Sequence, residues 1–395
     1  MNATFIVILT LQSVTCDPLS YVPPCSRMPF DHLIYQLPPK PDIDLSEVSV
    51  LLEKANQAIG QLNGVVETAA DPSVLNYMYV RKEAVLSSQI EGTQSTLDDL
   101  LKYESEQTHG IPIADASEVS SYVAALNHGL KRIKEGFPLS LRLIREIHKI
   151  LLTNSRGQTK LPGEFRSSQN WIGGTRPGNA RFVPVPPDKL MAVLGDLELF
   201  MNNEDTIPNL IKAALIHVQF ETIHPFLDGN GRLGRLLITF FLCVKGVLDS
   251  PFLYLSLFFK KNRTLYYDAL NGVRKDGDWE NWIKFFLEGV IETANDAKTT
   301  LIAIQNIFSA DSEKIKTLGR ASQSAQKVFK VFQKKPMLTV AEIVKMIGST
   351  KPTVIKSLNH LIDLGIIENN SEKKWGQMYT YKGYTDLLSA DVDPL

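Results

Sequence analysis

Apolar residues recur every three or four positions along most of this 395-residue chain, which is the spacing of helices that bury one face. The pattern predicts a mainly α-helical protein, with extended segments confined to one stretch near the middle and one near the C-terminal end. Gly, Pro, Ser and Thr residues at the edges of the apolar runs mark where these helices begin and end. The helices expected from the pattern cover residues 46–64, 72–90, 97–103, 117–133, 139–154, 209–220, 236–244 and 289–308.

Two segments depart from this helical pattern. Residues 163–184 are rich in Gly, Pro and Asn, and extended stretches lie on both sides of the turn-rich residues 175–180. This arrangement indicates a β-hairpin, or flap, inserted in the helical region. Residues 1–40 contain two Pro-Pro pairs and are expected to form an irregular arm on the surface.

Residues 311–395 show a different order, with short helical runs followed by two extended segments, 366–368 and 378–381. Thr339 is expected to cap the second helix of this module, and Ser349 the third. The order resembles a winged helix-turn-helix, whose recognition helix enters DNA. The module carries 13 Lys and Arg against 9 Asp and Glu, a small positive excess, so DNA binding, protein docking and homodimer formation all stay open. The side chains expected to face DNA are Thr350, Lys351, Thr353, Lys356, Lys373 and Lys374.

Composition narrows the class of protein. With 44% hydrophobic and 22% charged residues and a net charge of −1, the chain has no overall field that favours nucleic acid or anionic membranes. The apolar run 5–11 is too short to span a bilayer, and no basic residue precedes it as in a signal peptide. Cys16, Cys25 and Cys243 lack metal-ligand spacing, and their odd number favours a reducing compartment. We therefore expect a cytoplasmic protein without a membrane partner.

The stretch with the clearest chemistry is residues 224–235, His-Pro-Phe-Leu-Asp-Gly-Asn-Gly-Arg-Leu-Gly-Arg, between two predicted helices. Its glycines let the backbone turn several N–H groups toward one point at a helix N-terminus, where negative charge is favoured. Arg232 and Arg235 are three positions apart and can clamp one polyphosphate. Asp228 is an oxygen ligand suited to Mg²⁺, and His224 is the side chain here whose pKa lies near neutrality. These features indicate nucleotide chemistry with His224 as the general base.

The same stretch resembles the Fic family signature, His-Pro-Phe-x-Asp/Glu-Gly-Asn-Gly-Arg-x-x-Arg, at every fixed position. The resemblance covers about residues 40–300. It implies transfer of AMP from ATP to a Ser, Thr or Tyr hydroxyl of a target protein, or of the protein itself, with release of pyrophosphate. It also implies that His224 deprotonates this hydroxyl and that Asp228 holds Mg²⁺. The phosphate-binding residues that it implies are Gly229, Asn230 and Gly231 for the α- and β-phosphates, and Arg232 and Arg235 for the outer ones.

A second motif lies at the end of the predicted helix 72–90. Residues 87–92 match Ser/Thr-x-x-x-Glu-Gly/Asn, which is found in Fic proteins with a built-in inhibitor. The plain alternative is a solvated Glu91 followed by a glycine that ends the helix, but an acid at a helix C-terminus opposes the dipole and needs a partner. By the resemblance, Glu91 pairs with Arg235 and keeps it from the γ-phosphate. Ser87, on the same face, would anchor the inhibitory helix.

Further candidate residues lie outside the two motifs. By the resemblance, the flap holds the target segment by strand addition, so that backbone pairing aligns the hydroxyl with the base. An adenine pocket needs a ring that stacks and an amide that reads polar edges. The flap residues to test are Gln169, Trp171 and Ile172, and the candidates for the adenine pocket are Asn262, Tyr266 and Tyr267. No functional role is assigned to His109, His128, His148 or His217.

These patterns predict four regions: an irregular arm (1–40), a helical region with the inhibitory helix (41–115), a Fic core (116–300) and a winged helix (311–395). The predicted function is an autoinhibited protein AMP-transferase. One alternative is a DNA-binding regulator whose core only senses nucleotide, although such a core would be expected to have lost His224 or Asp228. The other is a Fic protein that uses another nucleotide, such as UTP, or removes AMP.

Overall fold

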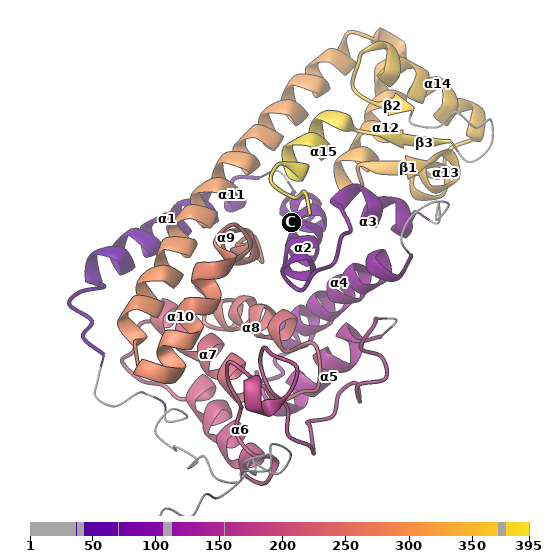
Figure 1. Ribbon diagram of the computed structural model, residues 1–395. Helices are drawn as coiled ribbons and strands as arrows, with labels where there is room; N and C mark the ends of the chain where they lie inside the picture. The colour runs from indigo at the N-terminus through magenta and orange to yellow at the C-terminus, as the bar shows by residue number, and fades with distance from the viewer. Residues whose placement is uncertain are drawn as a thin grey trace, which may run out of the picture.

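The computed structural model describes Leu37 and residues 43–69, 71–105, 113–153, 155–369 and 377–394. In these ranges the chain is mainly helical with one small sheet, as the sequence predicted (Figure 1). None of the helices described is long and apolar enough to cross a membrane. The expected N-terminal arm apart from Leu37, the first two cysteines, His109, Lys373 and Lys374 all lie outside the described residues.

The helical body contains the helices that the sequence predicted, with some different ends, and three helices that the expected ranges did not include (α6, α9 and α10). Gly64, expected to end the first helix, lies inside α1. The helices are α1 (Ser49–Glu67), α2 (Pro72–Ile90), α3 (Leu97–Glu104), α4 (Ile113–Lys134), α5 (Leu141–Leu151), α6 (Pro187–Asn202), α7 (Asn209–Ile223), α8 (Asn230–Val244), α9 (Leu255–Lys261), α10 (Arg263–Asp276) and α11 (Trp279–Lys316).

Helices α7 and α8 form the centre of the body and pack against each other. Every residue from Leu210 to Ile223 is buried, so α7 has no solvent face. Helix α8 begins six residues earlier than the predicted start at Leu236. Gly229 adopts a left-handed conformation (φ 77°), which a glycine reaches without strain, and turns the chain directly into this helix. The motif 224–235 therefore forms the turn between two buried helices and the beginning of the second one.

Helix α11 is one continuous helix of 38 residues that leads from the body to the C-terminal module (Figure 1). It crosses the predicted boundary between residues 300 and 311. Trp282 fixes it to α7, because the indole N–H donates a hydrogen bond to the carbonyl of Ala214 at 2.9 Å. Helix α1 packs along the same helix (Figure 1).

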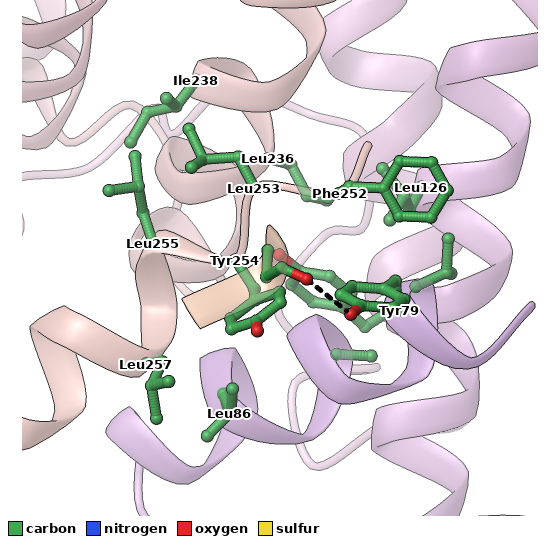
Figure 2. Close-up of a cluster of buried hydrophobic side chains, with 14 of the residues drawn as sticks. Tyr79, Leu86, Leu126, Leu236, Ile238, Phe252, Leu253, Tyr254, Leu255 and Leu257 are labelled. Carbon is green, nitrogen blue, oxygen red and sulfur yellow. Dashed lines mark hydrogen bonds between the residues drawn. The ribbon is translucent and has the colours of Figure 1, made fainter. Parts of the chain in front are cut away.

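A buried cluster fastens α2 to the rest of the body (Figure 2). The ring centroid of Tyr79 lies 5.1 Å from that of Phe252 and 5.5 Å from that of Tyr254. The Tyr79 hydroxyl donates to the carbonyl of Ala297 in α11 at 3.2 Å. Leu236 of α8 belongs to the same cluster. Because interiors are close-packed, α2 cannot move as a whole without opening this cluster.

The C-terminal module contains the helices and the two strands that the sequence predicted, one further strand, and one further helix after the last strand. Its antiparallel sheet has the order β1–β3–β2, with Leu338 opposite Tyr379 and Glu368 opposite Thr380. Thr339 caps α13 as predicted, but the predicted cap at Ser349 is wrong, because Thr350 is the residue before α14. The elements are α12 (Ser322–Lys334), β1 (Met337–Thr339), α13 (Val340–Ile347), α14 (Lys351–Asp363), β2 (Glu368–Asn369), β3 (Met378–Thr380) and α15 (Lys382–Ser389).

After α15 the chain returns to the helical body and lies beside α2 (Figure 1). The side-chain amide of Gln89 in α2 donates to the carbonyl of Val392 at 2.8 Å, and Val392 is itself buried. Lys261 Nζ lies 3.1 Å from the carboxylate of Asp391. The C-terminal segment 390–394 is thus attached to the helix that ends in the second motif.

The approach of α4 to α8 gives a test of the packing. A Cβ atom on Gly129 would lie 2.3 Å from the buried ring of Phe240, whereas one on Gly64, also inside a helix, would meet nothing within 4 Å. We expect Gly129→Ala to destabilise the protein by roughly 1–3 kcal/mol through overpacking. Gly64→Ala should stabilise it by roughly 0.5–1 kcal/mol, because alanine loses less backbone entropy in a helix. The measurement is the urea midpoint by circular dichroism, and equal shifts for the two variants would contradict this packing.

Candidate active site

The chain makes a sharp turn between α7 and α8. His224 ends α7 in a left-handed conformation (φ 49°), which is rare for a residue with a side chain. The buried side chain of Asn230 closes the turn, since its Oδ1 accepts a hydrogen bond from the Phe226 N–H and its Nδ2 donates to the Phe226 carbonyl, both at 2.9 Å. The Asn230 amide is therefore used to shape the turn, whereas the sequence had assigned this residue to phosphate binding.

The segment between α5 and α6 holds this turn from outside. Asn170 Nδ2 donates to the carbonyls of His224 and Phe226, both at 3.0 Å. Buried Arg166 donates from Nε to the His224 carbonyl at 3.0 Å and from its backbone N–H to Pro225 at 2.9 Å. Because the carbonyls of His224 and of the two residues after it accept these hydrogen bonds, the strained His224 is kept in one orientation.

Arg235 is buried in α8 and bound to both residues of the second motif. Its Nε donates to Ser87 Oγ at 2.9 Å, and one Nη donates to the Ser87 carbonyl at 2.9 Å and to Glu91 Oε1 at 2.7 Å. Burial alone would raise the pKa of Glu91, but the charge and hydrogen bond of Arg235 outweigh it and lower that pKa. A Cβ atom on Gly231 would lie 2.3 Å from Glu91 Oε1, so this carboxylate lies against the first turn of α8.

Arg232 has a different partner. Its guanidinium is buried and donates to Glu118 Oε1 in α4, and it lies 3.9 Å from Asp228 Oδ1. The other Glu118 oxygen accepts from Arg156 Nε at 3.3 Å. The two arginines of the motif are thus held by different carboxylates from different helices.

Asp228 is the candidate metal ligand, and its side chain is 39% exposed. Oδ1 accepts a hydrogen bond from the Gly229 N–H at 2.6 Å, and the second oxygen lies on the side of Gly157. Among the described residues no cluster of three or more His, Cys, Asp or Glu could hold a metal ion. Mg²⁺ that arrives with nucleotide phosphates needs only one or two carboxylates and keeps several waters, so a single Asp228 fits such an ion.

The imidazole of His224 is mostly buried, with 22% of the side chain exposed. Burial and then the nearby charge of Arg274 hold the pKa of His224 well below the usual value for histidine. Its Nδ1 lies 3.9 Å from Glu221 Oε2, and burial raises the pKa of that carboxyl to about 7. The imidazole is therefore neutral at physiological pH and able to accept a proton.

Most of the candidate residues described above line one pocket of about 290 Å³. It combines the candidate base, the candidate metal ligand, the first turn of α8 and the Glu91 carboxylate with residues from α4 and from the loop after α5. The residues that line it are Glu91, Glu118, Arg156, His224, Leu227, Asp228, Gly229, Asn230, Gly231 and Arg232.

The expected adenine residues do not line this pocket. Tyr266 is buried in the core, where its ring stacks on Phe259 at 4.5 Å and its hydroxyl lies 2.8 Å from His217 Nε2. Asn262 donates to the Phe258 carbonyl at 3.1 Å. Tyr267 is half-buried next to Tyr266, with 5.2 Å between ring centroids. The Tyr266 ring is packed against Phe259 and His217, so in this structure it has no free face on which a nucleobase could stack.

The predicted flap contains less β-structure than expected. A single antiparallel bridge joins Ile172 to Phe182, and a 3-10 turn (Pro177–Asn179) lies between them. Gln169 Nε2 donates to the Pro184 carbonyl at 2.9 Å and helps to close the base of the flap. The Trp171 ring is exposed. Glycines and prolines in this segment limit regular pairing to this bridge.

His148 is part of the site, although no role for it was expected from the sequence. The Gly163 N–H donates to His148 Nδ1 at 2.8 Å, so Nε2 carries the proton and donates to the Asp228 carbonyl at 3.0 Å. Its ring stacks on Phe226 at 3.6 Å, and burial lowers its pKa to about 4. A neutral imidazole on the apolar face of α5 looks like an ordinary core residue in the sequence, and only the fold shows that it holds Asp228.

Glu118 and Arg156 were missed as well. Glu118 is a charged residue on the buried face of α4, between Ala116 and Val119, and all three are buried. A charge at a buried helix position signals a buried counter-ion. Arg156 lies in a short polar loop that gave no signal.

Comparison with known proteins supports these assignments of fold and family. Residues 50–131 match the Fic/DOC family N-terminal domain, and residues 138–242 match the Fic/DOC family domain. A probable protein adenylyltransferase of Aquifex aeolicus is 30% identical over 196 residues, which are 50% of this chain and 55% of that protein. The protein adenylyltransferase fic-1 of Caenorhabditis elegans is 31% identical over 154 residues, 38% of this chain and 27% of that protein. The chain thus spans about half or less of the length of these relatives.

Solved structures share the fold at low sequence identity. A Fic family protein of Desulfovibrio desulfuricans superposes with a TM-score of 0.56 at 20% identity, over 85% of this chain and 95% of that one. A Fic domain protein of Bacteroides thetaiotaomicron has a TM-score of 0.51 at 21% identity, over 63% of this chain and 96% of that one. Since both family domains are matched in order, the part of the chain from residue 50 to residue 242 belongs to the Fic/DOC family, and the solved structures share its helical fold.

Proposed function

We propose that this protein transfers AMP from ATP to a Ser, Thr or Tyr hydroxyl of a target protein, or of itself, and releases pyrophosphate. The observation that carries the proposal is the pocket in which His224, Asp228 and the first turn of α8 meet. The names of the relatives, protein adenylyltransferases, support the same reaction class. Since these relatives are matched over only part of their length, the activity is proposed here from the site itself.

The neutral imidazole of His224 would accept the proton of the target hydroxyl as its oxygen bonds to the α-phosphorus. The bond between the α-phosphorus and the oxygen that bridges to the β-phosphate breaks at the same centre, and pyrophosphate leaves with the bonding electrons. Backbone N–H groups of the first α8 turn and the guanidiniums would hold the phosphate oxygens, where positioning and charge supply most of the catalysis. Mg²⁺ held by Asp228 would neutralise charge on the phosphates.

Glu91 is the proposed inhibitor of this reaction. Its carboxylate lies against Gly231 and binds Arg235, so it takes both the place and the partner that an outer phosphate would use. A nucleotide can then bind only with its phosphates displaced from the productive position. Ser87 supports this state, because its hydroxyl and its backbone carbonyl both accept hydrogen bonds from the Arg235 guanidinium.

Target recognition is proposed for the flap. Exposed Trp171 and the single bridge at Ile172 offer a short extended segment next to the turn that holds His224. A peptide that pairs with this segment would have its hydroxyl aligned by the backbone, and the chemistry of its neighbours would be read by flap side chains.

DNA binding by the C-terminal module is a second candidate function. Thr350, Lys351, Thr353 and Lys356 are all exposed on the first turns of α14, at the far end of the molecule from α7 (Figure 1). A DNA-binding role predicts retardation of duplex DNA that weakens as salt rises. Lys351→Ala/Lys356→Ala should lower the salt slope, whereas Lys314→Ala/Lys316→Ala, the same charge change on α11, should not. Identical retardation by both double variants would argue against this surface.

The inhibitory role of Glu91 is tested with α-labelled ATP and magnesium, with and without lysate. We expect Glu91→Gly to raise labelling of protein by roughly 10- to 100-fold, because a charge-assisted pair contributes about 1.5–3 kcal/mol. Glu204→Gly, which changes an exposed loop glutamate, is the control and should label as weakly as wild type. Adding His224→Ala to Glu91→Gly should remove the label by a factor of roughly 10²–10⁴. ATP binding without label in any variant would instead favour a nucleotide sensor.

The state of His224 gives a pH prediction. Because the pKa of His224 is lowered, the base should stay deprotonated as the pH falls from 8 to 6. A histidine with the usual pKa of about 6.5 would lose roughly fourfold in kcat/KM over that interval. The measurement is the initial rate of Glu91→Gly with magnesium in excess, so that ATP stays complexed. A flat profile is expected, and a decline with its midpoint near 6.5 would contradict the buried, neutral base.

A further inference from the structure

The loop after α5 forms one wall of the pocket, although none of its residues belongs to either motif. Arg156 lines the pocket together with the residues of the turn between α7 and α8. The next residue, Gly157, lies so close to Asp228 that a Cβ atom there would be 2.4 Å from Asp228 Oδ2. Arg156 is therefore next in sequence to Gly157, whose backbone lies against the candidate metal ligand Asp228.

This loop is fixed by its own hydrogen bonds. Ser155 Oγ donates to the Leu152 carbonyl at 3.0 Å and accepts from the Gly157 N–H at 3.2 Å. The Gly157 carbonyl accepts from the Lys160 N–H at 2.8 Å. Since the backbone on both sides of Arg156 is held, its side chain leaves from a defined point at the pocket rim.

The guanidinium of Arg156 is oriented as well, while 59% of the side chain remains exposed. Its Nε donates to Glu118 Oε2 at 3.3 Å, and one Nη lies 3.6 Å from Asp115 Oδ1 and 3.5 Å from Thr93 Oγ1. Glu118 is 5% exposed and binds Arg232 with its other oxygen. One buried carboxylate thus holds two guanidiniums, one in the motif and one in the loop, at the same side of the pocket.

The other charges of the pocket leave a role for the Arg156 guanidinium. Glu91 is paired with Arg235, and Glu118 shares its single charge between Arg232 and Arg156. Asp228 is the candidate ligand for Mg²⁺. An ATP–Mg²⁺ complex keeps excess negative charge on its outer phosphates, and guanidiniums are the side chains that best match phosphate oxygens.

We propose that Arg156 is a third phosphate-binding arginine, which contacts the β- or γ-phosphate of the nucleotide and later the departing pyrophosphate. Glu118 acts as a positioning residue that aims Arg156 and Arg232 at the same group. The proposal rests on the proposed function only for the identity of the nucleotide. Its consequence is selectivity: the site prefers nucleoside triphosphates to monophosphates by a contact that lies outside the motif.

Binding is measured by calorimetry with magnesium and ATP or AMP, in the full chain carrying Glu91→Gly and His224→Ala so that no turnover occurs. Adding Arg156→Ala should weaken ATP binding about tenfold, the loss of one charge-assisted contact, and leave AMP binding unchanged. Arg156→Lys should recover part of the loss, because it keeps the charge without the planar fork. Arg142→Ala, which removes a 75% exposed arginine from α5, is the matched control and should change neither affinity.

Equal weakening of ATP and AMP by Arg156→Ala would overturn the proposal and make Arg156 a purely structural partner of Glu118. Unchanged ATP binding would overturn it too. If Arg156→Ala lowers the melting temperature, the comparison of Arg156→Lys with the parent decides, since the lysine keeps a charge beside Glu118. Failure of the proposed function shows differently: ATP would bind and discriminate as expected, but Glu91→Gly with His224 intact would transfer no label.

Discussion

The buried guanidinium of Arg235 is the constraint on which the rest of the site depends. A charged group that is 2% exposed must be paired and fully hydrogen-bonded, or it destabilises the fold by several kcal/mol. Here Ser87 and Glu91 supply those partners, which ties the end of α2 to the start of α8. Under the proposed function the same requirement would make the pair a switch, because a phosphate offers the oxygens that Glu91 offers and would compete with it for one cation.

The turn that carries His224 shows how much of a catalytic site is scaffold. Asn230 bonds to Phe226 within the turn, Asn170 and Arg166 donate to the His224 carbonyl, and His148 donates to the Asp228 carbonyl. These contacts use up the polar atoms of residues that a motif alone would assign to substrate. What remains for the nucleotide is the neutral imidazole, one carboxylate oxygen, backbone N–H groups and guanidiniums, all in fixed positions.

Helical spacing in the sequence was enough to predict most of the helical body, because burying one face leaves a clear period. The motif could be recognised from the sequence as well, since its glycines and charged residues are adjacent in the chain. Prediction from the sequence failed where the determining contact is between distant segments. Tyr266 has the chemistry of an adenine-binding ring but is enclosed by Phe259 and His217, and Glu118 is a lone charge whose partner lies 114 residues away. The flap was overestimated because glycine and proline allow extended backbone without enforcing its pairing.

After α15 the chain returns to α2, so the end of the C-terminal module is attached to the helical body. The C-terminal module is joined to the body by the continuous helix α11, by the packing of α12 and α15 against α2, and by the bond from Gln89 to the Val392 carbonyl. A module held at several points cannot swing about α11 without breaking the other contacts. Because Gln89 lies two residues before Glu91, detachment of the C-terminal segment would remove a contact close to the end of α2. The bond is made to a backbone carbonyl, so it depends on the path of the chain there and not on the side chain at 392.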